Sequence, residues 1–107
     1  MAVYALNLFN VKNGEEYREY AKRAEEPVRK YGGKVIAIGK LDSSPEGDIA
    51  PRQVMMLVEW ESKEGIYKYV SDPDLEDLHP HRELGVDDFV WHLFEKLEDL
   101  RPVLSHS

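Results

Sequence analysis

The stretch Tyr4-Ala-Leu-Asn-Leu-Phe-Asn-Val11 has the pattern of an apolar strand, and it leads through Asn13-Gly14 into a helical pattern that begins with Glu-Glu-Tyr17. About fifty residues later the same order recurs, when the apolar run Val54–Trp60 leads into Gly65-Ile-Tyr-Lys-Tyr-Val70. Two strand-helix-strand halves form a small α+β sheet that has helices on one face and leaves the other face open. We therefore look for function on the open face of this sheet.

The remaining elements follow from turn signals and periodicity. Gly32-Gly33 ends the first helix, in which we expect a kink or a restarted turn at Pro27, and Asp72-Pro73 starts a new short helix. The expected order is strand 2–11, helix 14–31, strand 34–41, loop 42–51, strand 54–60, helix 62–71, short helix 72–76 and strand 89–97. We expect one domain over residues 1–97 and a polar C-terminal tail over residues 98–107.

Composition excludes several classes of protein. The chain of 107 residues carries a net charge of −7 and no cysteine, which excludes disulfides and thiolate metal sites. Residues 54–107 hold five Lys and Arg against thirteen Asp and Glu, and such an acidic balance argues against nucleic acid or an anionic membrane as partner. No stretch has the length of a membrane span or the pattern of a signal peptide, so we expect a cytoplasmic protein.

Both faces of the sheet are apolar in sequence. In residues 2–11 the two alternating sets, one with Tyr4 and Leu6 and the other with Ala5 and Phe9, are both apolar, and Val54-Met-Met-Leu-Val58 shows no alternation. Two helices cover only one face of a four-stranded sheet. The sequence therefore predicts a homodimer that pairs the open sheet faces of two chains.

Three segments carry a family resemblance: Tyr17-x-x-Tyr20-Ala21, Lys30-Tyr-Gly-Gly-Lys-Val-Ile-Ala37 and Ser71-Asp72-Pro73. Together they resemble the dimeric α+β barrel proteins, and most closely a family of small uncharacterised bacterial proteins. The resemblance covers the chain from about Val3 to Leu97. It implies a ferredoxin-like βαββαβ antiparallel sheet with helices on one face, paired sheet to sheet into a homodimeric α+β barrel.

The same resemblance sets expectations for function without fixing a substrate. The relatives include cofactor-independent antibiotic-biosynthesis monooxygenases, haem-degrading enzymes, muconolactone isomerases and stress-responsive proteins of unknown role. It implies a pocket that lies between sheet and helices or inside the barrel. The closest family supplies no established catalytic residues to transfer.

Candidate residues for cofactor-free chemistry lie on the strands. His92 interrupts an apolar strand and has the intrinsic pKa of a general base, while Asn7 and Tyr4 supply polar contacts to a substrate. Trp60, Trp91 and Arg52 are candidate substrate-binding residues, with Arg52 as a carboxylate anchor. A structural histidine, core tryptophans and a surface arginine are the competing interpretations.

The segment Leu78-His79-Pro80-His81-Arg82-Glu83 departs from the family pattern. If the segment is extended, His79, His81 and Glu83 share one side and suit a divalent metal ion. The competing interpretation is an exposed loop whose histidines are solvated.

Three function hypotheses follow. The first is a small-molecule enzyme of the cofactor-independent monooxygenase or isomerase type, for which we expect no cofactor. The second is a ligand-binding or structural dimer without turnover, and the third is a metal-dependent enzyme that uses the His79, His81 and Glu83 segment. Fold alone does not decide between them.

Overall fold

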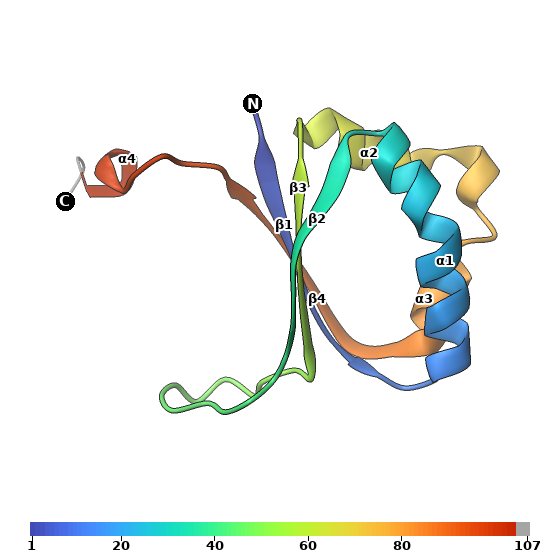
Figure 1. The fold of residues 1–107 in the computed structure, drawn as a ribbon, viewed down its shortest axis with the longest axis horizontal. Helices are drawn as coiled ribbons and strands as arrows, with labels where there is room; N and C mark the ends of the chain where they lie inside the picture. The colour runs from blue at the N-terminus through green and yellow to red at the C-terminus, as the bar shows by residue number, and fades with distance from the viewer. Residues whose placement is uncertain (105–107) are drawn as a thin grey trace.

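The computed structural model describes residues 1–104, which form four strands and several helices around one sheet (Figure 1). The elements in chain order are β1 (Val3–Val11), α1 (Gly14–Lys30), β2 (Gly33–Lys40), β3 (Val54–Trp60), α2 (Lys63–Ser71), the 3₁₀ helix η1 (Pro73–Leu75), α3 (His79–Gly85), β4 (Val86–Glu95) and α4 (Arg101–Leu104).

The sheet has the strand order β2-β3-β1-β4, and every neighbouring pair is antiparallel. With α1 and α2 as the two connecting helices, this is the predicted ferredoxin-like βαββαβ arrangement, which is confirmed. β1 is central, and Asn7 pairs with Met56 of β3 on one side and with Trp91 of β4 on the other. This register fixes which side chains share a face.

The helices α1, α2 and α3 all lie on one side of the sheet (Figure 1). Side chains of Val3, Ala5, Val58 and Trp60 point to that side and are buried with Ile66 of α2 in the core. Because successive residues of a strand point to opposite faces, the intervening residues of the same strands belong to the open face. The predicted alternation of β1 is confirmed by this burial.

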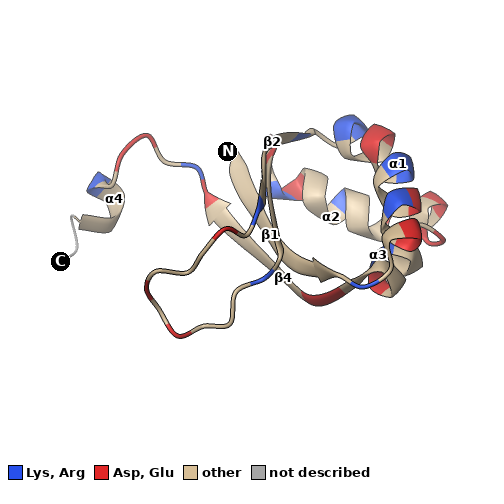
Figure 2. Cartoon of the chain, turned by 60° about the horizontal axis from the view of Figure 1, so that its bottom comes forward, with Lys and Arg blue, Asp and Glu red and all other residues tan. Residues whose placement is uncertain are grey.

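The helix α1 begins and ends as its sequence requires. The side chain of Asn13 caps it by accepting hydrogen bonds from the backbone N–H groups of Glu15 and Glu16, and Gly32 follows it with a φ of 92°. Charged residues of both signs alternate along its outer side (Figure 2). We expected a kink or a restarted turn at Pro27. α1 runs through Pro27 to Lys30 as one helix, so no turn restarts there, and the kink stays a prediction.

The segment between α2 and β4 is more helical than the sequence indicated. The short helix after Asp72 is present as η1, and the Asp72 side chain accepts a hydrogen bond from the Asp74 N–H. Beyond it, α3 occupies the histidine-rich segment, for which no helix was expected. β4 runs over Val86–Glu95, so it starts three residues earlier and ends two residues earlier than the predicted strand 89–97.

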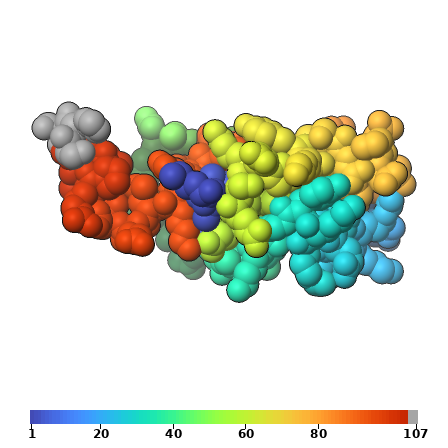
Figure 3. Space-filling model, turned by 90° about the horizontal axis from the view of Figure 1, so that it is seen from above, coloured from blue at the N-terminus to red at the C-terminus, as the bar shows by residue number. Residues whose placement is uncertain are grey.

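Two segments extend away from the sheet and helices. The loop between β2 and β3 lies at one end of the sheet, and the chain after β4 leads α4 to the opposite end of the molecule from α1 (Figures 1 and 3). The radius of gyration is 15.2 Å, compared with about 13 Å for a compact chain of roughly 100 residues. The predicted tail covers residues 98–107, of which 105–107 lie outside the described residues, and its separation from the domain stays a prediction.

In the part of the chain that the structure describes, no helix is both long enough and apolar enough to cross a membrane.

We expect Gly65→Ala to destabilise the fold by roughly 2–3 kcal/mol, because a Cβ at this buried position of α2 would collide with the backbone carbonyl of Tyr31 at the end of α1. Urea denaturation of the variant and the parent protein measures this difference. Gly14→Ala is the control, because an added Cβ there meets nothing within 4 Å. Equal stability of Gly65→Ala and Gly14→Ala would show that the α1–α2 contact is loose.

Candidate functional site

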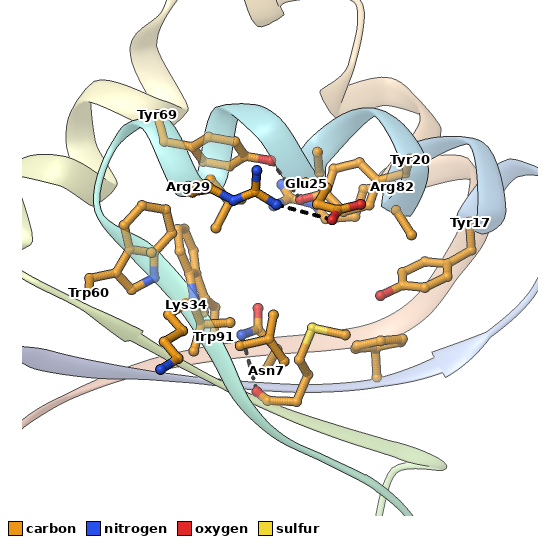
Figure 4. A pocket seen from close by; sticks show the side chains of 18 of the residues that line it. Asn7, Tyr17, Tyr20, Glu25, Arg29, Lys34, Trp60, Tyr69, Arg82 and Trp91 are labelled. Atoms are coloured by element: carbon orange, nitrogen blue, oxygen red, sulfur yellow. Dashed lines mark hydrogen bonds and ion pairs between the residues drawn. The ribbon is translucent and has the colours of Figure 1, made fainter.

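A cavity of about 690 Å³ lies between the helix-facing side of the sheet and α1 (Figure 4). Its walls come from all four strands and from α1, α2 and α3. The lining residues are Asn7, Phe9, Tyr17, Tyr20, Ala21, Ala24, Glu25, Val28, Arg29, Gly33, Lys34, Val35, Met56, Val58, Trp60, Tyr69, Arg82, Phe89 and Trp91. Such a volume falls within the roughly 300–1,000 Å³ that ligand pockets occupy.

Aromatic rings form much of the wall. Phe9 lies 5.1 Å from Tyr17 and 6.0 Å from Phe89, measured between ring centroids. Trp60 and Tyr69 make a second pair, with centroids 5.8 Å apart. Rings at these separations pack against one another favourably. These contacts stabilise the rings in the cavity wall, and the space between them stays open.

The tyrosine hydroxyls in the cavity are hydrogen-bond donors rather than bases. The hydroxyl oxygens of Tyr20 and Tyr69 are 3.0 Å apart, and burial, reinforced by Tyr20, raises the pKa of Tyr69. Burial, with a smaller contribution from Tyr20, raises the pKa of Tyr17 to about 12. Tyr17 and Tyr69 therefore keep their protons at neutral pH.

Asn7 lies on the sheet floor of the cavity. Its side-chain amide N–H groups donate to the backbone carbonyls of Ala5, at 3.2 Å, and Met56, at 3.3 Å (Figure 4). Both contacts involve the amide nitrogen, so they hold the side chain in place and leave its amide oxygen as the group that can accept a further hydrogen bond.

Arg82 brings a positive charge to the cavity from α3. Its guanidinium carbon lies 4.9 Å from the centroid of the Phe89 ring and 6.0 Å from that of Tyr20. Within residues 1–104, no carboxylate oxygen lies within 4.0 Å of its guanidinium nitrogens. The other cavity arginine, Arg29, is paired with Glu25 and Glu26 of α1.

The two predicted tryptophans line the cavity, and both indole N–H groups are shielded from water without a hydrogen-bond partner among the described residues. Trp60 is only 3% exposed. Because protein atoms cover both Nε1 atoms, the two rings border the cavity with their carbon atoms rather than with their N–H groups.

The remaining predicted residues of the cofactor-free site lie elsewhere. The register pairs His92 with Leu6 and Phe94 with Tyr4, so His92 and Tyr4 belong to the open face, opposite Asn7. In one chain, His92, Tyr4 and Asn7 therefore do not share a cavity. Arg52 donates to the backbone carbonyls of Asp88 and Ala50 and holds the end of the β2–β3 loop against β4.

The histidine-rich segment is helical, whereas the metal hypothesis assumed an extended chain. His81 Nδ1 lies 2.6 Å from an Oε2 of Glu16 and ties α3 to α1, while the His79 ring packs edge-on against Tyr69 with centroids 5.5 Å apart. Across the described residues, no group of three or more His, Asp or Glu side chains is placed to hold a metal ion. The helix turns His79 and His81 toward different partners, which corrects the assumption that they share a side.

Sequence reasoning missed Tyr17, Tyr20, Tyr69 and Arg82 as cavity residues. The tyrosines of α1 belong to its apolar stripe, and such a stripe usually packs against a sheet. Arg82 comes from a helix that the sequence did not indicate. Arg82 has no Asp or Glu three or four residues away within α3, and an unpaired arginine of this kind is a signal for a binding site. The signal can be recognised only once the helix α3 is known.

Replacing His79 should weaken the pH dependence of stability between pH 7 and 5.5. Burial and the charge of Arg82 lower the pKa of His79, against smaller opposite effects of Glu83 and the carbonyls of Tyr69 and Val70. As the pH falls below about 6.5, His79 takes up a proton in the unfolded chain more readily than in the folded one, so the free energy of unfolding falls. His79→Phe keeps the ring contact and removes this loss.

Denaturation curves of the parent protein and the variant at pH 7.0, 6.3 and 5.5 measure the effect. An identical pH dependence of the parent and His79→Phe would contradict the burial of this imidazole.

The comparisons with known proteins agree with this architecture. The family model described as a domain of unknown function, DUF1330, matches residues 2–92. No curated protein matches the chain. Among solved structures, the RPA0582 protein of unknown function from Rhodopseudomonas palustris is 19% identical, with a TM-score of 0.83 over 92% of this chain and 84% of that one.

Two further solved structures are similar at lower identity. SnoaB from Streptomyces nogalater, described as a cofactor-independent oxygenase, is 13% identical with a TM-score of 0.65 over 92% of this chain and 96% of that one. A dimeric ferredoxin-like protein of unknown function from Bacteroides fragilis is 14% identical with a TM-score of 0.53 over 89% and 96%. At these identities the likeness shows the shared ferredoxin-like fold. Because the family model covers most of the chain, this protein belongs to the DUF1330 family.

Proposed function

We propose that this protein binds a small organic molecule in the cavity between the sheet and α1. The observation that supports the proposal is the cavity of about 690 Å³ itself, in a chain of only 107 residues. Protein interiors are packed as densely as organic crystals and leave few voids larger than a water molecule. A space of this size beneath a helix is therefore better explained as a binding site than as a packing defect.

Contacts at both ends of α1 explain why the helix does not close onto the sheet. At its start, the Gly85 carbonyl accepts hydrogen bonds from the N–H groups of Lys12 and Asn13. At its end, the Tyr31 hydroxyl donates to Asp72 at 2.5 Å. The turns in the middle of α1, between these two contacts, line the cavity.

The entrance lies between α1 and the edge strand β2. Ala21, Glu25 and Arg29 of α1 and Lys34 and Val35 of β2 line the cavity and are also exposed to solvent. A ligand enters past these residues, with polar groups at the rim and aromatic groups within. This arrangement is typical of small-molecule sites.

We expect Ala21→Phe to weaken binding of the neutral probe N-phenyl-1-naphthylamine at least roughly tenfold, because the added ring occupies the entrance. Fluorescence titration measures the dissociation constant. Ala21 is exposed, so the melting temperature should stay close to that of the parent protein.

Ala50→Phe, in the exposed loop after β2, is the matched control and should bind the probe as the parent protein does. If the parent protein does not bind the probe, or if both variants bind it equally well, the cavity is not the binding site.

Catalysis by a cofactor-independent oxygenase or isomerase is the second candidate. The likeness of the fold to SnoaB supports it, together with the polar groups Asn7 and Arg82 beside an apolar cavity. However, Glu25 is the only Asp, Glu or His among the lining residues, and it is paired with Arg29 near the rim. Binding without turnover therefore has the better support.

Oxygen uptake with 1-naphthol as a phenolic probe separates these two functions. Uptake that Asn7→Ala abolishes and His92→Gln leaves intact would favour oxygenation in the cavity, and binding without uptake would favour the non-catalytic protein.

We also propose that the open sheet face pairs with a second copy of this chain. The open-face side chains from β1, β3 and β4 include Tyr4, Leu6, Leu8, Met55, Leu57, Val90, His92 and Phe94, with the charged Glu59 opposite Tyr4. They form a largely apolar face that no helix covers (Figure 1). The described neighbour from Bacteroides fragilis is dimeric. Pairing would enclose His92 and Tyr4 between two chains, in a compartment separate from the cavity.

Phe94→Glu should convert a dimer into a monomer, because Phe94 is 50% exposed on the open face and a carboxylate there would be buried on pairing. Native mass spectrometry reads the subunit number directly. Leu84→Glu, at an exposed position of α3 on the helical side, is the control and should remain dimeric. A monomeric parent protein would exclude the paired-sheet arrangement.

A further inference from the structure

We infer that the ligand of the cavity is an aromatic anion, with its negative charge on Arg82. This inference rests on the proposed function and specifies the class of ligand. It follows from what the polar groups on the cavity wall still lack.

Arg82 requires an anion. Its guanidinium group has no carboxylate partner in residues 1–104 and lies against the faces of Phe89 and Tyr20. Aromatic faces stabilise a cation but leave its N–H donors in the ring plane unsatisfied. A carboxylate or ionised phenol fits this planar set of donors, and the low-polarity surroundings strengthen the pairing.

The other polar groups of the cavity add mainly donors. When two hydroxyls share one hydrogen bond, as those of Tyr20 and Tyr69 do, one hydroxyl proton remains free to donate. Tyr17 keeps its proton because burial raises its pKa to about 12. Among these interior groups only the Asn7 amide oxygen is an acceptor alone, and no carboxylate lies among them to pair with a cationic ligand, so the charge of Arg82 disfavours a cation.

The aromatic character of the ligand follows from the walls. Phe9, Phe89 and Tyr17 line one part of the cavity, while Trp60 and Tyr69 line another. Figure 4 shows Tyr17, Trp60 and Tyr69 around a shared space. Arg82 and Tyr20 lie on its helical side, and Trp91 and Asn7 lie on its sheet side (Figure 4). Rings in this arrangement offer both faces and edges to a ligand ring.

The test compares three probes that share one ring system: 6-methoxy-2-naphthoate, its neutral methyl ester and the cationic (6-methoxy-2-naphthyl)methylammonium. Isothermal titration calorimetry at pH 7.5 gives each dissociation constant. We expect the carboxylate to bind roughly 10- to 100-fold more tightly than the ester, the range that one charged hydrogen-bonded contact contributes. The cation should bind most weakly.

Arg82→Gln should remove most of the difference between carboxylate and ester, whereas Arg29→Gln should preserve it, because Arg29 is already paired with Glu25 and Glu26. Retained binding of N-phenyl-1-naphthylamine by Arg82→Gln shows that the cavity is intact in the variant.

The outcomes separate this inference from the proposed function. If the parent protein binds none of the naphthyl probes, including N-phenyl-1-naphthylamine, the proposed function fails. If it binds the neutral probe but holds carboxylate and ester equally, or if Arg82→Gln and Arg29→Gln behave alike, the cavity is a binding site and the assignment of an anionic ligand is overturned.

Discussion

The structure depends on how α1 is held at its two ends. At the N-terminal end a Cβ on Gly85 would approach the Tyr17 backbone nitrogen to 2.8 Å, and at the C-terminal end Gly65 lies directly against the carbonyl of Tyr31. Both contacts need a residue without a side chain, and both attach α1 to neighbouring helices rather than to the strands. The middle of α1 is therefore held away from the sheet floor, with an aromatic-walled space beneath it.

The register of the central strand determines what that space contains. Pairing Asn7 with Met56 and Trp91 places these three residues under α1, and the period of two sends His92 and Tyr4 to the opposite face. One sheet thus serves two separate surfaces: a donor-rich cavity on the helical side and an apolar face on the other. The first suits a small molecule and the second a copy of the same chain, so the two proposals do not compete for residues.

Much of this could be predicted from sequence, for identifiable reasons. The apolar runs in residues 2–11 and 54–60, the helical periodicity that starts at Tyr17 and the Gly32-Gly33 stop located the sheet and α1, because these signals act locally. Trp60, Trp91 and Asn7 were correctly assigned to strands, and the structure brings them to the cavity. His92 was placed with Asn7 because both interrupt apolar strands, but which strand positions share a face depends on the pairing of β1 with β4. The helix α3, and with it Arg82, was missed because His79-Pro80-His81 has no helical signature of its own and is held by contacts to Glu16 and Tyr69 from distant elements.

The most direct test of this account is a ¹H–¹⁵N NMR titration of the parent protein with N-phenyl-1-naphthylamine. The chain has only two tryptophans, and both indole N–H groups lie in the cavity wall, so their two signals report on that site alone. We predict that both indole signals shift and saturate together, while the backbone amides of the open-face residues Leu6 and His92 stay in place. Shifts at Leu6 and His92 with unmoved indole signals would place the ligand on the open sheet face and contradict the account.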